Sequence, residues 1–198
     1  MDKRPAGKNA RTVTIDDARN VVESFDAGMD GLAIKSRELT LDLLWKTETP
    51  FSRRQFAPGH VTCTALVFHP DQPKVLLMHH HRLRRWLLPG GHVEESDTSL
   101  AAAAAREAHE ETLVRVAYSH GSLLAGIDVH GIPPKKKEPF HLHHDLIWSF
   151  RAVTGDIATT EEAPAVIWAE ERDWDRLNVA DSIRNSIRRV SLEPKRGR

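Results

Sequence analysis

Two adjacent glycines followed by an alanine- and glutamate-rich stretch constrain the fold of this chain more than any other feature of its sequence. Gly90 and Gly91 lie in a short loop, and Asp97–Thr112 consists mainly of residues with high helix propensity, so it predicts a helix. The alanines at 101–105 give that helix a small-residue face that can lie close against a sheet. Because glycine has no Cβ, the loop lets backbone carbonyl and amide groups approach a metal ion or a phosphate.

Segments typical of strands and of helices alternate along the rest of the chain. Thr14 and Asp17 resemble a capping pair for a helix over residues 15–25, and Ser36 is the expected cap of a second helix that reaches about Lys46. One long helix amid strand-forming sequence predicts an α/β fold, an α/β/α layered domain with a mixed β-sheet and extra N-terminal helices. The expected strands are 61–68, 74–78, 114–117, 122–129, 141–152 and 165–169, with a last helix over 182–190.

Length and composition limit the function classes. A chain of 198 residues suits one domain, expected at 13–192 between a flexible N-terminus, 1–12, and a flexible tail, 193–198. Its 28 basic and 28 acidic side chains give no net charge, which does not favour nucleic acid or a membrane surface as a partner. The longest apolar stretch, Val61–Phe68, is far shorter than the roughly 18 residues of a membrane span. The charged start lacks the apolar region of a secretory signal, so we expect a cytoplasmic protein.

Three glutamates share one side of the predicted helix. Glu107, Glu110 and Glu111 are related as i, i+3 and i+4, so their carboxylates project within one turn and repel one another. An adjacent divalent cation turns this repulsion into coordination by hard oxygen ligands, and Arg106 can balance part of the charge. Glutamates are also common on solvated helical faces, and the glycine loop is what favours a metal site over that alternative.

The loop, the helix and their spacing resemble the signature of the Nudix hydrolases, the MutT-like proteins. That signature is a glycine, five residues, a glutamate, seven residues, Arg-Glu, two residues, Glu-Glu, one residue and a glycine. Gly91 begins the corresponding box, at about 91–113, and Arg106-Glu107 and Glu110-Glu111 match its second half. The segments Trp86–Gly91, Pro58–His60, His79–His80 and His143–Leu146 also resemble features of Nudix proteins, the last three those of a bacterial group.

The resemblance implies a Nudix-type α/β/α sandwich and an enzyme, a pyrophosphohydrolase acting on acid anhydrides. Its substrate would be a small-molecule nucleotide or other diphosphate, such as a nucleoside diphosphate linked to another moiety, attacked at phosphorus by metal-activated water. The implied cofactor is Mg²⁺ or Mn²⁺, bound by Glu107, Glu110, Glu111 and the carbonyl of Gly91. Arg106 would orient Glu107, and Arg106, Glu110 and Glu111 form the implied catalytic set. The general base stays open among Glu111, Glu138, Glu161 and Glu162.

This chain departs from the family pattern in the middle and at the end of the box. Asp97 stands where the family has glutamate, and the spacing from Asp97 to Arg106 is one residue longer. We expect the extra residue in the loop around 95–97, with a regular helix from about Thr98, rather than as a π-bulge among the alanines. Leu113 replaces the usual glycine, which removes the easy left-handed end, so we expect the helix to stop in another way.

Side chains before the glycine loop are candidates for substrate binding. Arg84 or Arg85 can fork onto a phosphate, and Trp86 can stack on a base. The alternative is a solvated basic turn with Trp86 packed in the core.

Histidines cluster at 79–81 and 141–144. In extended chain His141, His143 and Asp145 share one face, and His143 is a candidate substrate contact. Imidazole and carboxylate suit zinc, but no motif with established ligand spacing appears, which favours histidines lining a pocket rim.

Hydrolysis is not the only function that this pattern allows. A non-catalytic Nudix-fold module that binds or senses a nucleotide or metabolite is the alternative, since the altered spacing and Leu113 bear on catalysis. Diphosphate isomerisation and a zinc hydrolase built on the histidine clusters rank behind these. The sequence leaves the oligomeric state open, a homodimer included.

Overall fold

A central strand, β1 (Gly59–Phe68), is buried on both faces and organises the sheet. The computed structural model describes residues 12–117, 122–135 and 137–192. Along its whole length β1 pairs in parallel with β7 (His141–Ala152), from Gly59 opposite Leu142 to Phe68 opposite Arg151. Its other edge pairs antiparallel with two shorter strands. The sheet is therefore mixed, as the sequence predicts.

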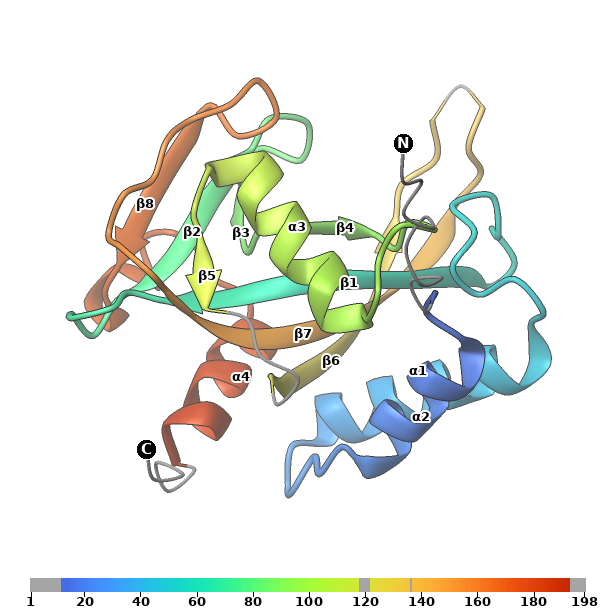
Figure 1. Ribbon diagram of the computed structural model, residues 1–198. Coiled ribbons are helices and arrows are strands. Elements are labelled where there is room, and N and C mark those ends of the chain that lie inside the picture. The colour runs from blue at the N-terminus through green and yellow to red at the C-terminus, as the bar shows by residue number, and fades with distance from the viewer. Residues whose placement is uncertain (1–11, 118–121, 136, 193–198) are drawn as a thin grey trace, which may run out of the picture.

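The eight-stranded sheet has the order β3-β2-β1-β7-β5, with β4 on β1, β6 on β7 and β8 on β2 (Figure 1). The strands predicted at 61–68, 74–78, 141–152 and 165–169 are confirmed. Two three-residue strands, 85–87 and 90–92, were not predicted, and Gly90 and Gly91, expected in a loop, belong to the second of them and pair with β1. The other strands are β2 (Val75–His80), β3 (Arg85–Leu87), β4 (Gly90–His92), β5 (Val116–Ala117), β6 (Leu123–Ile132) and β8 (Ala165–Ala169). The helices are α1 (Ile15–Ser24), α2 (Gly31–Lys46), α3 (Leu100–Thr112) and α4 (Asp181–Leu192), with a 3-10 turn at Glu171–Asp173.

The sheet has an apolar core on each face, as an α/β/α sandwich requires. On one face Val61, Cys63 and Ala65 of β1 pack in a cluster that includes residues of α1, α2 and α3. On the other face Leu66 belongs to a cluster with Ile183 and other residues of α4 and the segment before it. Figure 1 shows α3 crossing the sheet over β1, with α1 and α2 together below it and α4 apart from them. The expected fold class is confirmed.

Helix α3 is a regular α-helix from Leu100 to Thr112. The Ser99 side chain caps it by accepting from the Ala102 amide at 3.0 Å, and Ala103, Ala104 and Ala108 are buried against the sheet. The extra residue of the box therefore lies in the loop before the helix, as expected, although the helix begins at Leu100 rather than at Thr98.

The expectation for the end of this helix was wrong. Leu113 adopts the left-handed conformation itself, with φ 55° and ψ 9°, and its amide donates to the His109 carbonyl at 2.8 Å. A leucine in this conformation carries a strain of about 1–2 kcal/mol that glycine avoids. The helix thus ends in the same geometry that a glycine would give, at an energetic cost.

We expect Leu113→Gly to stabilise the protein by about 1 kcal/mol, which raises Tm by about 2–4 °C. Half of the Leu113 surface is already exposed, so little apolar burial is lost. Leu113→Ala is the matched control, because alanine keeps the strained Cβ. Thermal unfolding of both variants checks this, and an equal rise in the two would contradict it.

The start of α2 also differs from the prediction. The helix begins at Gly31, where the Asp30 carboxylate caps it by accepting from the Leu32 and Ala33 amides. Ser36, the expected cap, is instead buried inside the helix, where its hydroxyl accepts from the amide of Val129 in β6 at 3.2 Å. By contrast, the predicted capping pair of Thr14 and Asp17 at α1 is confirmed.

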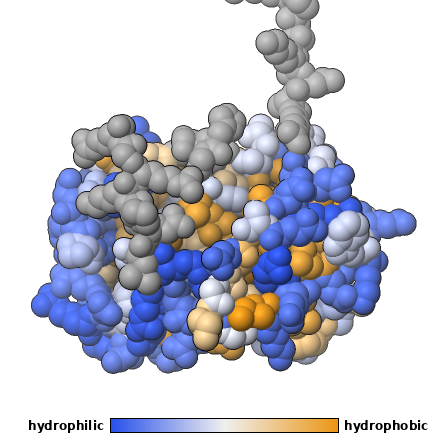
Figure 2. Space-filling view, turned by 90° about the horizontal axis from the view of Figure 1, so that it is seen from below, coloured by the Kyte–Doolittle hydropathy of each residue, from blue (hydrophilic) through white to orange (hydrophobic). Residues whose placement is uncertain are grey.

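The surface of the molecule gives two observations that concern possible partners. No helix of the described residues is long and apolar enough to cross a membrane. Seen from below, hydrophilic residues cover most of the surface and hydrophobic ones form separate patches (Figure 2). Residues 1–11 and 193–198, expected to be flexible, lie outside the described part of the chain.

Candidate active site

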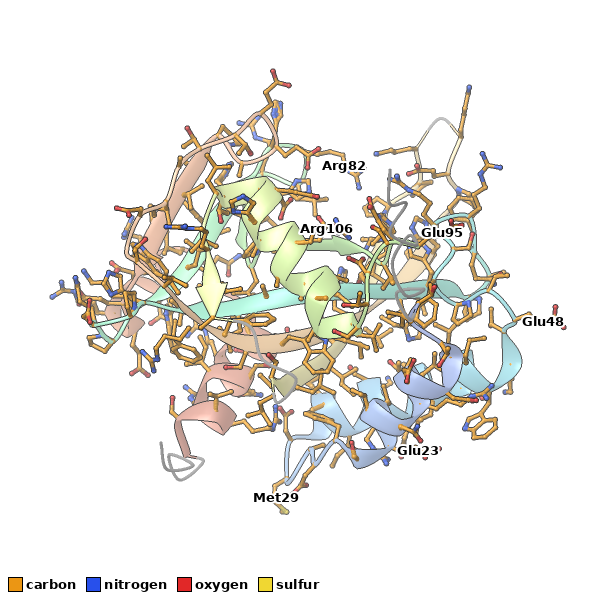
Figure 3. The ribbon with its side chains drawn as sticks, viewed as in Figure 1. Glu23, Met29, Glu48, Arg82, Glu95 and Arg106 are labelled. Carbon is orange, nitrogen blue, oxygen red and sulfur yellow. The ribbon has the colours of Figure 1, made fainter. Side chains whose placement is uncertain are left out.

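Arg106 is the centre of a charged network on α3. Its Nε and Nη2 atoms donate to the two oxygens of Asp97 at 3.1 and 3.0 Å, and Nη2 also donates to the His92 carbonyl at 2.8 Å. Its Nη1 atom donates to Glu107 and to Glu110, both at 3.0 Å. Figure 3 labels Arg106 on α3 and Glu95 in the loop that leads into this helix from β4. One guanidinium therefore ties the box loop to two of the three glutamates.

The carboxylate of Glu107 lies directly against the glycine loop. A Cβ added at Gly91 would lie only 2.6–2.7 Å from the carboxylate atoms, so glycine is what allows this approach. Burial raises the pKa of Glu107, although the charge and hydrogen bond of Arg106 oppose the rise. An acidic oxygen and the backbone of β4 are thus brought together at the position where the sequence predicts a cation.

Glu111 is the most buried of the three glutamates, with 6% of its surface exposed. Its Oε2 accepts from the Gly90 amide at 2.9 Å. Burial raises the pKa of Glu111 to about 8, the Gly90 hydrogen bond opposes the rise, and the charges of Glu107 and Glu162 add to it. The helix thus presents to the loop a carboxylate that changes its protonation state near neutral pH.

Glu110 differs from its neighbours because its side chain is 54% exposed and its described partner is Arg106. Glu107 and Glu110 share Arg106 as their partner, whereas Glu111 accepts from the Gly90 amide. The donor set is nonetheless all oxygen, with the Gly91 backbone beside Glu107. Such hard donors fit Mg²⁺ or Mn²⁺.

The later loops offer one acidic residue close to Glu111. Glu162 lies near enough for its charge to raise the pKa of Glu111. Glu138 instead lies 3.8 Å from Lys135 and acts on the pKa of His60. Of the sequence candidates outside α3, Glu162 is therefore the one with a described interaction at the carboxylates.

The candidate substrate residues before the two glycines differ in their exposure. Arg84 has a positive φ of 51° in the turn between β2 and β3, and its amide donates to the His80 carbonyl. Both Arg84 and Arg85 are exposed. Trp86 is half-buried, packs partly against the apolar core of the α4 face and meets the His79 ring edge-on at 5.4 Å. The arginines are free to reach a phosphate, while Trp86 has a packing role as well.

Beyond the carboxylates, the face of the sheet that carries α4 turns polar at one end. The expectation that His141, His143 and Asp145 share a face is confirmed, since the ring of His143 lies 5.3 Å from that of His141. Neighbouring strands add residues that sequence reasoning missed. These are His60 and Thr62 of β1, His92 of β4, and Asp128 and His130 of β6.

Burial keeps most of these imidazoles neutral. Burial, together with the neighbouring His60, lowers the pKa of His92 to about 4 and that of His143 to about 2. Burial also disfavours the charged form of His130, but the hydrogen bond that its ring donates to Asp128 and the charge of Asp145 raise its pKa to about 9. His144 points to the opposite face, where its Nδ1 lies 3.1 Å from the Thr40 hydroxyl.

One pocket of the described residues does not coincide with these groups. It has a volume of about 850 Å³ and runs between the segment at 12–15, residues 48–52 and the loop at 93–96. None of Glu107, Glu110 and Glu111 lines it. The chemistry of the side chains, not the size of this pocket, therefore places the candidate site at α3 and β4.

Comparisons with known proteins found similar sequences and structures. A curated relative, the 8-oxo-(d)GTP phosphatase of Mycolicibacterium smegmatis, is 28% identical over 130 residues, which are 64% of this chain and 36% of that protein. The chain thus spans about a third of the length of that relative. Among solved structures, an Ap4A hydrolase of C. elegans is 15% identical, with 66% of this chain and 94% of that chain covered and a TM-score of 0.48. A NUDIX-family hydrolase of Clostridium perfringens is 22% identical, with coverages of 67% and 97% and a TM-score of 0.48.

The family model of the NUDIX domain matches residues 58–190. The match runs from the start of β1 into α4 and includes the glycine loop and α3, while α1 and α2 precede it. It covers more than half of the sequence, and the chain therefore belongs to the NUDIX domain family.

Proposed function

We propose that this chain is a Nudix pyrophosphohydrolase that cleaves a diphosphate linkage in a nucleoside diphosphate derivative, with Mg²⁺ or Mn²⁺ as its cofactor. The observation that carries this proposal is the placement of Glu107 and Glu111 against the Gly90-Gly91 loop. Membership of the family and the matched Arg-Glu and Glu-Glu pairs support it.

Glu107, Glu110, Glu111 and the Gly91 carbonyl are the groups that would hold the cation. When bound, the cation offsets phosphate charge and activates the attacking water. Arg106 positions Glu107 and Glu110 and links them to Asp97. Glu111, whose carboxylate contacts the Gly90 amide, and Glu162, whose charge acts on Glu111, are the two candidates to accept a proton.

Arg84 and Arg85 are proposed to bind the phosphates, and Trp86 and His143 to contact the rest of the substrate. The exposed guanidinium groups support the first role, since arginine pairs with phosphate in a forked geometry. The name of the mycobacterial relative makes 8-oxo-dGTP one compound to test. The regular α3 and the intact Arg106 network favour hydrolysis over a module that only binds a nucleotide.

The test is phosphate or nucleotide release from a panel of nucleotide sugars, ADP-ribose, dinucleoside polyphosphates and nucleoside triphosphates, 8-oxo-dGTP included. We expect hydrolysis of at least one compound with Mg²⁺ or Mn²⁺ and none in EDTA. Activity that survives EDTA would refute the metal requirement. Tight binding of a panel compound without turnover would instead establish the binding module.

Gly91→Ala sharpens this test, with Gly31→Ala as its control. The added methyl group at 91 must displace the Glu107 carboxylate, a flexible end, so the expected loss is about tenfold or more in activity with little change in Tm. At Gly31 nothing lies within 4 Å of the added Cβ, so activity stays unchanged.

A further inference from the structure

Four imidazoles from three strands gather at the polar end of the sheet. His60 belongs to β1, His92 to β4, and His141 and His143 to β7. The ring of His60 lies 5.0 Å from that of His92, 5.1 Å from that of His141 and 4.8 Å from that of His143, measured between centroids. His60 and His141 are almost fully buried. The four rings therefore form one cluster in which His60 contacts each of the other three.

Backbone carbonyls decide which nitrogen of two of these rings carries the proton. The Nδ1 of His60 lies 3.1 Å from the Gln55 carbonyl, and the Nδ1 of His141 lies 2.8 Å from the Pro139 carbonyl. Because a carbonyl oxygen only accepts, each Nδ1 must donate, and each neutral ring then has its lone pair on Nε2. A histidine that binds a metal ion commonly donates its other ring N–H to a carbonyl in this way.

The ring nitrogens of three of these histidines lie close to one another. One ligand nitrogen each from His60, His141 and His143 lies within 4.8 Å of the other two. The Nε2 of His92 lies 3.1 Å from the Nε2 of His60. In a tetrahedral site with Zn–N bonds of about 2.0–2.1 Å the ligand nitrogens are roughly 3.3 Å apart. To share one ion, the nitrogens of His60, His141 and His143 would draw closer together, and His92 would exchange its hydrogen bond to His60 for the ion.

We propose that His60, His141 and His143 bind a zinc ion, with His92 as the fourth ligand. Four neutral nitrogen donors suit Zn²⁺ and the neighbouring transition metals, whereas Mg²⁺ prefers oxygen. The site is thus chemically distinct from the carboxylates of α3. Neither His79 nor His81 belongs to it, in contrast to the zinc alternative considered from the sequence.

The ion would have a structural role next to the active site. It would join β1, β4 and β7 at the end where β4 leads into the box loop. The carbonyl of His92 accepts from Arg106 at 2.8 Å, so a ligand of the zinc ion also contacts the network that positions Glu107. The nearby group of Asp128, His130 and Asp145 is not included, since His130 is already paired with Asp128 at 2.9 Å.

The test is metal binding by the whole chain after a chelator has removed bound ions. With Mg²⁺ in excess, we expect one equivalent of Zn²⁺ to bind and to raise Tm by roughly 5–10 °C. Co²⁺ in its place should give the strong visible absorption of a tetrahedral site, and X-ray absorption of the zinc form should show nitrogen neighbours only. No binding under these conditions, or an oxygen-dominated shell, would overturn the proposal.

Single substitutions test which residues bind the zinc ion. His141→Gln and His143→Gln should each weaken Zn²⁺ binding by at least a hundredfold, and the Tm of the stripped proteins reports whether they fold. If the His141→Gln protein does not fold, because His141 is buried, the test rests on His143→Gln, since His143 is only half-buried. His81→Gln, at an exposed histidine outside the cluster, and Glu111→Gln, at the proposed Mg²⁺ site, should keep full binding. Zinc binding that is lost in Glu111→Gln but kept in His143→Gln would refute the histidine site without touching the proposed hydrolysis.

Discussion

Replacing Glu111 by glutamine is expected to lower kcat by about a thousandfold, and in EDTA at pH 8 to make the protein more stable. The loss of turnover follows from the proposed roles, because glutamine neither binds a cation as strongly nor accepts a proton. The gain in stability follows from burial. The carboxylate is 6% exposed, and its pKa of about 8 means that the folded protein resists its ionisation.

The sign of the pH effect can be worked out. Below the ordinary pKa of 4.5 the folded and unfolded chains both hold the proton, so Glu111 does not lower the free energy of unfolding. Between that value and about 8 the unfolded chain releases the proton and the folded chain keeps it, so the free energy of unfolding falls as pH rises, by up to a few kcal/mol. Glutamine does not titrate. Its advantage over glutamate should therefore be absent near pH 4 and largest at pH 8.

Thermal unfolding in EDTA at the two pH values, together with turnover in Mg²⁺, measures both effects. Glu110→Gln is the matched control, because Glu110 is largely exposed and its replacement should lower activity without this pH-dependent change in Tm. Equal pH dependence in the wild type and in Glu111→Gln would show that Glu111 ionises freely in the folded chain.

The sequence predicts the long elements well because their patterns extend over many residues. β1, β7 and α3 each keep one pattern over ten or more residues, so their secondary structure is unambiguous. Strands β3 and β4 have three residues each and contain arginine or glycine, so no periodicity marks them. Ser36 was misplaced because its partner, the Val129 amide, lies far along the chain.

The candidate site, too, contains residues that the sequence predicts and residues that it does not. The helical spacing of Glu107, Glu110 and Glu111 puts them on one side of α3 whatever the rest of the fold is. The hydrogen bond from Gly90 to Glu111 and the contacts among His60, His92 and His143 depend on how strands far apart in sequence are aligned. These contacts follow from the register of β1 against β7 and β4. The sequence contains one usable signal, because His60 and Thr62 are two residues apart and therefore share a face of the strand.

Arg106→Ala should be the most destabilising of the single substitutions, by about 3–5 kcal/mol. The side chain is 20% exposed and pairs with Asp97, which is only 5% exposed, through two hydrogen bonds. Its loss leaves a buried carboxylate without its cation and removes the neutralising charge beside Glu107 and Glu110. Arg106→Lys keeps the charge but not the forked geometry, so it should be intermediate.

Arg184 provides the matched control for this comparison. It is exposed to the same extent, 21%, but its carboxylate partner Asp175 is 91% exposed, so water replaces the lost contact and Arg184→Ala should cost less than about 1 kcal/mol. Urea unfolding of both variants measures the difference. Adding Asp97→Asn to Arg106→Ala removes the stranded charge, and the double variant should be less destabilised than the sum of the single ones. Strict additivity would mean that Arg106 stabilises α3 through its packing and not through Asp97.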